Sequence, residues 1–150
     1  MDHKERAGEL FVEGYNCAQA VAIAFCDLTG YSEAETARLA SPFGGGMGRM
    51  REVCGAVSGM FMVLGVLYGY DGNADSDEKK ELYARVQSLA AKFRETAGSI
   101  VCREILKNPP SDPAPTERTA EFYRVRPCTR MVMLAAGLLD EFIAENPLQK

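Results

Sequence analysis

Histidine is almost absent from this sequence, since His3 is its only histidine. A two-histidine metal triad is therefore excluded within one chain. Serine and cysteine nucleophiles commonly rely on a histidine base, and His3 lies so close to the N-terminus that we expect it to be mobile. Histidine-assisted catalysis is therefore not expected. No Glu-x-x-His pair occurs either, so a di-iron carboxylate bundle is not supported.

Short cofactor motifs are also missing. The glycine-rich segment from Phe43 to Gly59 contains no G-x-x-x-x-G-K-[ST], and Arg49 stands where a dinucleotide motif needs its third glycine. No C-x-x-C pair occurs, so the local signals of a zinc site or a ferredoxin cluster are weak. The pairs Met60-x-Met62 and Met131-x-Met133 do not share a helix face, and we interpret them as core residues.

Positive charge is not in excess, because the net charge is −4 and charged residues make up 25% of the chain. This balance argues against a nucleic-acid partner. The N-terminus has no apolar segment typical of a signal peptide, so we expect a cytoplasmic protein with reduced thiols. The uncharged stretch from Val53 to Tyr70 is just long enough to span a membrane, but it is rich in glycine and has amphipathic flanks. We interpret it as a buried central helix, without membrane insertion.

Helical periodicity, by contrast, extends over nearly the whole chain. Capping boxes are indicated where Asn16, Ser32 and Asp75 each precede a glutamine or glutamate by three residues. The expected helices run from Asp2 to Gly14, Cys17 to about Gly30, Ser32 to Ala40, Val53 to Tyr70, Asp75 to Gly98, Ser99 to Leu106, and Pro127 to Glu145. The segment 119–125 is ambiguous between a helix and an extended piece. We therefore predict one all-α domain over residues 1–150, a compact multi-helix bundle with a proline-rich loop at 108–117 before the last helix.

Five cysteines stand out against this helical background: Cys17, Cys26, Cys54, Cys102 and Cys128. All but Cys26 fall at predicted helix N-termini, where free backbone N–H groups and the helix dipole favour a thiolate. Cys26 lies nine residues after Cys17 in the same predicted helix, which places it on the opposite face unless that helix breaks. We interpret Cys26 as a small core hydrophobe.

The remaining four cysteines are compatible with three kinds of protein. They could cycle between thiols and disulfides, with Cys54 attacking because Arg49 and Arg51 lie near it in the sequence. Alternatively, Cys17, Cys54, Cys102 and Cys128 could together bind a thiophilic metal ion or an iron–sulfur cluster. In the third interpretation they are ordinary core residues of a helical interaction domain.

The order of these residues resembles a known family. A lone Cys17, the sequence Cys54-Gly55-Ala56-Val57-Ser58-Gly59, and two further lone cysteines at 102 and 128 are similar to the C_GCAxxG_C_C family of redox-active proteins. The resemblance implies that these four cysteines, with Gly55, Ala56 and Gly59, form the functional motif. It also implies redox activity and genes that lie near transporter genes, but it names no substrate.

The glycines between Phe43 and Gly59 divide into two groups. We expect Gly44 to Gly48 to end one helix and turn the chain sharply. Gly55, Ala56 and Gly59 remove side chains from a buried helix, so that sulfurs, backbone or a cofactor can approach Cys54. On this hypothesis, Gly55→Val damages the site more than a comparable change at Gly45. The partners left open are a redox protein and a second copy of the chain.

Overall fold

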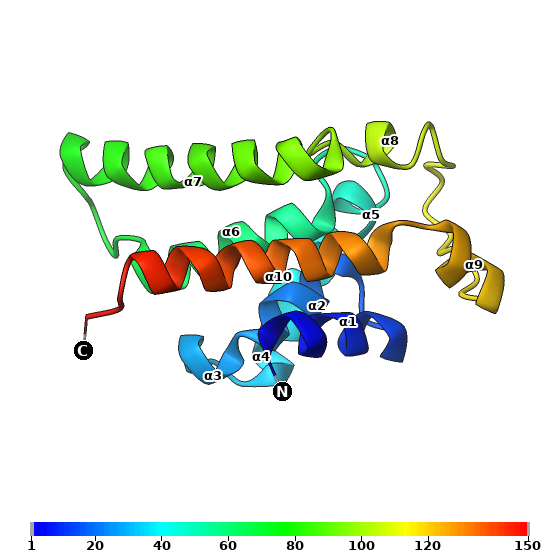
Figure 1. Ribbon diagram of the computed structural model, residues 1–150, viewed down its shortest axis with the longest axis horizontal. Helices are drawn as coiled ribbons and strands as arrows, with labels where there is room; N and C mark the ends of the chain where they lie inside the picture. The colour runs from blue at the N-terminus through cyan, green and yellow to red at the C-terminus, as the bar shows by residue number, and fades with distance from the viewer. Residues whose placement is uncertain (1, 150) are drawn as a thin grey trace.

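The computed structural model describes residues 2–149, and helices form nearly all of the regular structure within them (Figure 1). The single strand-like pairing in this range is an isolated antiparallel bridge between Val53 and Val101. The elements are α1 (His3–Glu13), α2 (Cys17–Ala24), α3 (Cys26–Thr29), α4 (Glu33–Ala40), the 3₁₀ helix η1 (Ser41–Phe43), α5 (Gly44–Met47), α6 (Gly55–Tyr68), α7 (Ser76–Ala97), α8 (Cys102–Ile105), α9 (Ala120–Val125) and α10 (Cys128–Glu145). The predicted all-α bundle is confirmed.

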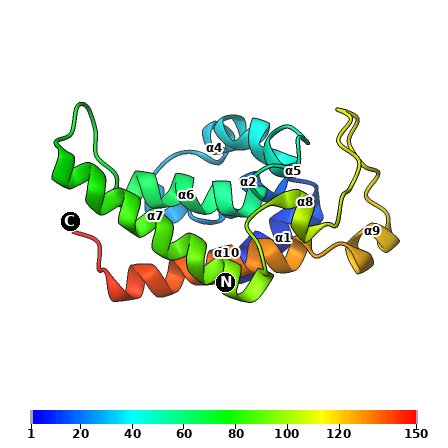
Figure 2. The ribbon, with the colours of Figure 1, turned by 90° about the horizontal axis from the view of Figure 1, so that it is seen from above.

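Helices α2, α6 and α10 pack against one another at the centre of the bundle. Helix α10 crosses the length of the molecule, with α7 along one side and α1 and α2 on the other (Figure 1). Side chains from five helices fill the space between them, including fully buried Phe11, Phe25, Met60, Phe93 and Leu139. Helices α6, α8 and α10 all begin toward the end of the molecule that carries α9, and the view from above agrees (Figure 2). Cys54, Cys102 and Cys128, which stand at the starts of these three helices, therefore lie toward the same end of the molecule.

The predicted caps explain where several helices begin. The Asn16 side chain accepts from the Gln19 N–H at 2.8 Å, and the Gln19 side chain accepts from the Asn16 N–H at 3.0 Å, which completes a capping box at α2. Ser32 caps α4 and Asp75 caps α7 in the same manner, each accepting one backbone N–H. Thr119 caps α9, so the ambiguous segment before the last helix is helical.

The expected helix from Cys17 to Gly30 is broken, which corrects the sequence prediction. At Phe25 the backbone has φ −103° and ψ 13°, and its N–H bonds to the Ala22 carbonyl, three residues back. The break turns the Phe25 ring into the core, where it stacks on the His3 imidazole with 4.1 Å between ring centroids. A second consequence is that Cys26 also begins a helix, so a helix-start position alone does not set it apart.

Helix α6 has buried residues only as far as Leu64, and its last four residues are exposed or half-buried. The residues from Gly55 to Met60 are buried, as are Val63 and Leu64, whereas Gly65 and Val66 are exposed. The hydropathy of the segment predicted burial over its whole length, but burial also depends on which other helices pack against each turn. The last turns of α6 border an open cavity. In residues 2–149, no helix has both the length and the apolar character needed to cross a membrane.

The expectations for Ser99 and His3 were also wrong. Val101, not Ser99, precedes the first residue of α8, and the Ser99 hydroxyl instead accepts from the Val101 N–H at 2.9 Å. His3 is not mobile, because its ring lies 2.7 Å from Asp140 and 3.0 Å from Asp27. These contacts join α1 to α10 and α3.

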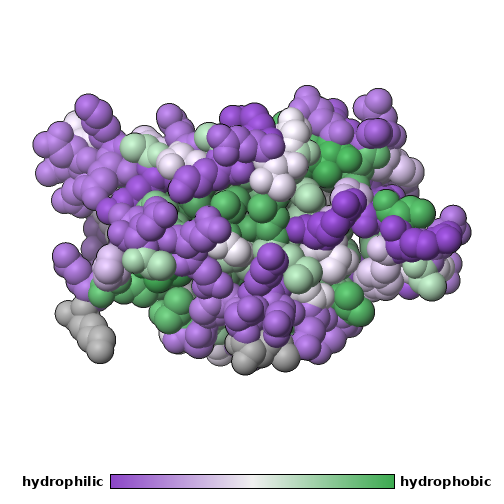
Figure 3. Space-filling model, in the orientation of Figure 1, coloured by the Kyte–Doolittle hydropathy of each residue, from purple (hydrophilic) through white to green (hydrophobic). Residues whose placement is uncertain are grey.

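The surface of the bundle is mostly hydrophilic on the face shown in Figure 3. Hydrophobic atoms show through between α7 and α10 and toward α8. Only Leu89, Ala90 and Phe93 of α7 are buried, so this long helix packs on the bundle mainly through its C-terminal half. The covered end of α7 leads directly into the segment that carries Cys102.

Candidate functional site

The glycine-rich loop before α6 is a left-handed turn. Five successive residues, 45 to 49, have φ between +57° and +69°, and Arg51 has φ +61°. Left-handed backbone costs about 1–2 kcal/mol for a residue with a side chain and almost nothing for glycine, which explains the glycines at 45, 46 and 48. Residues Met47, Arg49 and Arg51 carry the strain. The turn directs the Arg51 side chain inward, where only 4% of the residue is exposed.

Backbone hydrogen bonds bring Cys54 and Cys102 together. The Cys54 N–H donates to the Ile100 carbonyl at 2.7 Å, and the Cys102 N–H donates to the Glu52 carbonyl at 2.6 Å. Between them lies the bridge from Val53 to Val101. This short pairing joins the start of α6 to the start of α8, although the two cysteines are far apart in the sequence.

Gly46 makes this approach possible, which corrects the expected division between the two groups of glycines. A Cβ atom added at Gly46 would lie 2.6 Å from the Cys102 Cβ and 2.8 Å from the Arg51 Cα. Gly46 therefore provides clearance for a cysteine, in addition to turning the chain. Gly45 is no neutral comparison for Gly55, because its own φ of +66° disfavours any side chain.

The glycines of the C-G-A-x-x-G motif have two different contacts. A Cβ atom at Gly55 would lie 3.0 Å from the Cys17 Cβ and 3.0 Å from the Phe43 carbonyl oxygen, so Gly55 gives α2 room beside the cysteines. A Cβ atom at Gly59 would lie 2.7 Å from the Ala18 carbonyl oxygen, so Gly59 lets two helix backbones approach. Ala56 is fully buried in the core. Gly55 borders the cysteine site, and Gly59 and Ala56 support the packing of α6 on α2.

All four motif cysteines line one small cavity, which we call the cysteine cavity. Its volume is about 30 Å³, and its other walls include Gly45, Gly55, Arg51 and Met131. A space of this size suits one water molecule rather than a large ligand. All five cysteines are free thiols, and Cys26 lies elsewhere, with its sulfur 3.4 Å from the Thr36 hydroxyl. The expected separation of Cys26 from the other four agrees with this arrangement.

Cys17 and Cys128, which we call the outer pair, are half-buried. A hydrogen bond from the Cys17 thiol to the Cys128 thiolate lowers the pKa of Cys128 to about 7, despite burial, and Arg126, Arg118 and Arg51 lower it further. The same hydrogen bond, together with burial, raises the pKa of Cys17 well above its ordinary value. The first proton of the pair therefore leaves from Cys128.

Cys54 and Cys102, which we call the inner pair, are only 6% exposed. Burial raises the pKa of Cys54 to about 12, although the backbone N–H groups of Ala56 and Val57 oppose the shift. The predicted effect of the helix start is thus present at Cys54 but is outweighed by desolvation. Burial likewise raises the pKa of Cys102, against an opposing hydrogen bond that Arg51 donates to its sulfur over 3.7 Å.

Arg49 and Arg51 lie near Cys54 in the sequence, but their side chains donate hydrogen bonds to the proline-rich loop. Arg49 donates from Nε to the Asp112 carbonyl at 2.8 Å, and Arg51 donates from Nε to the Pro110 carbonyl at 2.9 Å. Both arginines thus hold the proline-rich loop against the glycine turn. Sequence reasoning missed the contributions of Arg118 and Arg126 to the cysteine site. The one available signal was their position within ten residues before Cys128.

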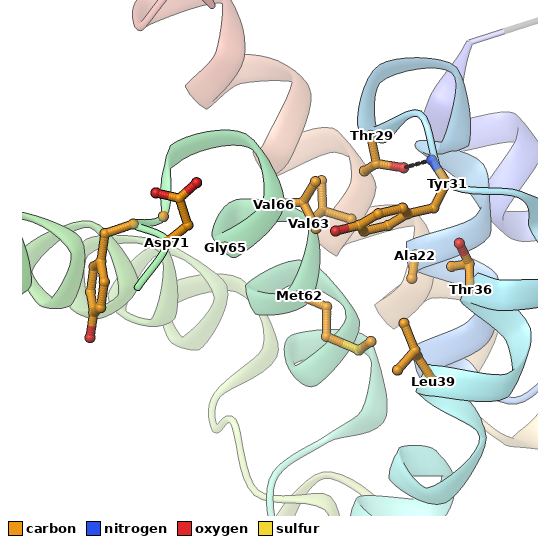
Figure 4. Close-up of a pocket in the computed structure, with 12 residues that line it drawn as sticks. Ala22, Thr29, Tyr31, Thr36, Leu39, Met62, Val63, Gly65, Val66 and Asp71 are labelled. Atoms are coloured by element: carbon orange, nitrogen blue, oxygen red, sulfur yellow. Dashed lines mark hydrogen bonds between the residues drawn. The ribbon is translucent and has the colours of Figure 1, made fainter. Parts of the chain in front are cut away.

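Two further features bear on ligands. In the described range 2–149, no three His, Cys, Asp or Glu side chains are arranged so that they could hold a metal ion. A larger cavity of about 570 Å³ lies away from the four motif cysteines, where Tyr31, Leu39, Met62 and Val66 project from three segments (Figure 4). Among the described residues that line it, Asp71 is the one charged residue, and none is a cysteine, histidine, serine or lysine. The chemistry-bearing residues therefore gather at the cysteine cavity.

A family model described as "Putative redox-active protein (C_GCAxxG_C_C)" matches residues 15–142. Searches of curated proteins and of solved structures gave no match. The matched range contains all four cysteines of the cavity and covers most of the chain. The protein belongs to this family.

Proposed function

We propose that this member of the C_GCAxxG_C_C family is a thiol–disulfide redox protein in which Cys128 attacks and Cys17 resolves. The observation that carries the proposal is the placement of Cys17 and Cys128 together in the wall of a cavity that four arginines also line. These positive charges favour a thiolate, in agreement with a pKa of about 7 at Cys128. A thiol whose pKa lies near the ambient pH is the most effective attacking group, because it combines a large thiolate fraction with good nucleophilicity.

The reaction is a two-step exchange with a disulfide R–S–S–R′. The Cys128 thiolate forms a bond to one sulfur of the substrate, the substrate S–S bond breaks, and R′S⁻ leaves. Cys17 then loses its proton to the departing thiolate and attacks the Cys128 sulfur. This second step releases RS⁻, which takes a proton from solvent, and forms a Cys17–Cys128 disulfide. Two electrons pass from the protein dithiol to the substrate, which is reduced to two thiols.

In this scheme Cys54 does not make the first attack, whereas the sequence predicted Cys54 as the attacking thiol. With a pKa of about 12 it is almost wholly protonated at pH 7, whereas about half of Cys128 is thiolate. We therefore assign the first attack to Cys128. Free thiols at all five cysteines suit a reducing compartment such as the cytoplasm, and the partner is a molecule that carries a disulfide.

A metal ion or iron–sulfur cluster is the second candidate, because all four motif cysteines line one cavity, although within residues 2–149 no three of them are arranged to hold an ion and their sulfurs would have to move. The cavity of about 30 Å³ would have to enlarge before it could accept a cluster. Anaerobic purification with metal analysis and a thiol count separates the two. Colourless, metal-free protein with five titratable thiols supports dithiol chemistry, whereas visible absorption with stoichiometric iron would overturn it.

The pairing is tested by mild oxidation of the metal-free protein followed by peptide mass spectrometry. We expect a peptide in which Cys17 is joined to Cys128, formed before any link to Cys54. The variant Cys26→Ser is the matched control, since Cys26 lies outside the cavity and its replacement leaves the pairing unchanged. A first disulfide between Cys54 and Cys102 would contradict the assignment.

A further inference from the structure

A third cavity, of about 320 Å³, lies beside the outer pair, and we call it the arginine cavity. Cys17 and Cys128 form part of its wall, so it is the space through which a substrate reaches them. Four arginines also line it, and its lining contains neither aspartate nor glutamate. These arginines come from two separate segments: Arg49 and Arg51 from the glycine turn, and Arg118 and Arg126 from the chain around α9.

Arg51 supplies an independent observation that points to an anionic ligand. Only 4% of this residue is exposed. Its Nη2 has no hydrogen-bond partner anywhere in residues 2–149. Its Nε is bonded to the Pro110 carbonyl and its Nη1 contacts the Cys102 sulfur. A buried guanidinium donor without a partner costs free energy, and an anion in the adjoining cavity would remove that cost.

Arg118 and Arg126 are held in place by a carbonyl oxygen and by aromatic rings, which carry no formal negative charge. Arg118 donates to the Phe11 carbonyl at 2.7 Å and stacks over the Phe11 ring at 4.3 Å. Arg126 lies over the Phe122 ring at 5.2 Å. Arg49 is the exception, with an Asp112 carboxylate oxygen 3.7 Å away and 61% of that aspartate side chain exposed. The cavity therefore concentrates positive charge next to a cysteine thiolate.

We propose that the arginine cavity binds the anionic group of a small disulfide, and that it selects carboxylate-bearing disulfides as substrates of the outer pair. The volume of about 320 Å³ is at the small end of ligand pockets and suits a metabolite-sized molecule rather than a protein loop. Guanidinium groups match the geometry of carboxylates and other oxyanions. The anion site stands on the cavity itself, whereas the substrate class rests on the proposed thiol–disulfide function.

Binding is tested first, without any redox step. The probe is thiodiglycolate, a thioether dianion that cannot exchange, titrated against the reduced wild-type protein at low salt, with inorganic sulfate in a parallel titration. We expect saturable binding of thiodiglycolate that weakens about tenfold in Arg126→Gln and in Arg49→Gln, as expected for loss of a charge-assisted hydrogen bond. Arg124→Gln is the matched control, because Arg124 is exposed, lies on α9 and does not line the cavity.

Unchanged thiodiglycolate binding in both variants would overturn the anion site, as would an absence of binding. Sulfate binding with equal affinity, lost in the same two variants, keeps the site but assigns it to inorganic oxyanions and overturns the carboxylate selection.

Substrate selection is tested with two disulfides, dianionic dithiodiglycolate and neutral 2-hydroxyethyl disulfide. Each rate is divided by the rate of a small model thiol with the same disulfide, which removes intrinsic reactivity. We expect a preference of about tenfold for the dianion, abolished in Arg126→Gln. Arg126 also lowers the pKa of Cys128, so the ratio of the two rates, not either rate alone, reports substrate binding.

The two proposals fail in different ways. Rapid exchange with both disulfides and no charge preference would overturn the substrate assignment and leave the thiol chemistry intact. Binding of thiodiglycolate without any exchange would overturn the thiol–disulfide function and leave the anion site intact.

Discussion

The outer and inner cysteine pairs face the same cavity of about 30 Å³, yet they differ in almost every chemical respect. The outer pair is half-buried and lies beside arginines, and the pKa of Cys128 falls to about 7. The inner pair is almost fully buried, and the pKa of Cys54 rises to about 12. Both pairs stand at helix starts, so the helix dipole does not explain why their pKa values differ. The difference in pKa comes from burial and from the nearby charges.

The largest difference is expected between two single variants, one with a replaced cysteine in the outer pair and one with a replaced cysteine in the inner pair. Cys128→Ser should slow reaction with 2-hydroxyethyl disulfide at pH 7 by at least about 100-fold, because the pKa values of the other three motif cysteines are raised. Cys54→Ser should change the same rate by less than about threefold, since Cys54 makes no first attack. Stopped-flow or thiol-release kinetics on both variants measure this. A larger loss in Cys54→Ser than in Cys128→Ser would reverse the roles of the two pairs.

The two ends of α6 give the next comparison. Gly55→Val introduces atoms within 3.0 Å of the Cys17 Cβ and the Phe43 carbonyl oxygen, so we expect a loss of about 1–3 kcal/mol in unfolding free energy. Gly65→Val is the control on the same helix, because a Cβ atom there would meet nothing within 4 Å. We expect that variant to stay within about 0.5 kcal/mol of wild type. Urea denaturation measures both, and equal losses would contradict the close packing at Gly55.

A smaller effect is expected within the outer pair itself. Cys17→Ala removes the donor that stabilises the Cys128 thiolate, so the pKa of Cys128 should rise and its reactivity at pH 7 should fall by up to about tenfold. Cys17→Ser keeps a hydroxyl donor and should lose less. Rates of alkylation of Cys128 with iodoacetamide, followed by mass spectrometry, distinguish the two. Equal pKa values in both variants would show that the arginines alone set the titration.

The smallest effect lies far from the cysteines, at His3. Burial lowers its pKa, but hydrogen bonds and charge from Asp27 and Asp140 outweigh burial and raise it above 6.5. The stabilisation is therefore complete below pH 6.5 and is lost as pH rises through the raised pKa. We expect His3→Gln to lower stability by less than about 1 kcal/mol at pH 6, with a smaller difference at pH 8. Thermal melts at the two pH values measure it, and a larger loss at pH 8 would contradict the sign.

The sequence was sufficient to predict the all-α bundle, most helix boundaries and the set of four cysteines, because caps and periodicity are local signals. It did not predict the break at Phe25, which depends on a stacking partner in another helix. Its assignment of the first attack to Cys54 stays an untested prediction, but the nearness of Arg49 and Arg51 along the chain does not support it. Those side chains extend to the proline-rich loop instead, and burial of a thiol depends on tertiary packing.

The glycine turn shows the same limit. Its composition correctly indicated a sharp change of direction, and the left-handed φ values of residues 45 to 49 confirm it. That Gly46 would collide with Cys102 if it had a side chain depends on a segment more than fifty residues away. No local pattern records such an approach.

The most direct test of the account is the titration of Cys128 in the reduced wild-type protein. Iodoacetamide labelling at a series of pH values, with each cysteine quantified by mass spectrometry, gives a separate profile for every thiol. We predict that labelling of Cys128 rises with a midpoint near pH 7, while Cys54 stays unlabelled until far higher pH. A midpoint for Cys128 near that of an ordinary thiol, or earlier labelling of Cys54, would contradict the division into a reactive outer pair and a protonated inner pair.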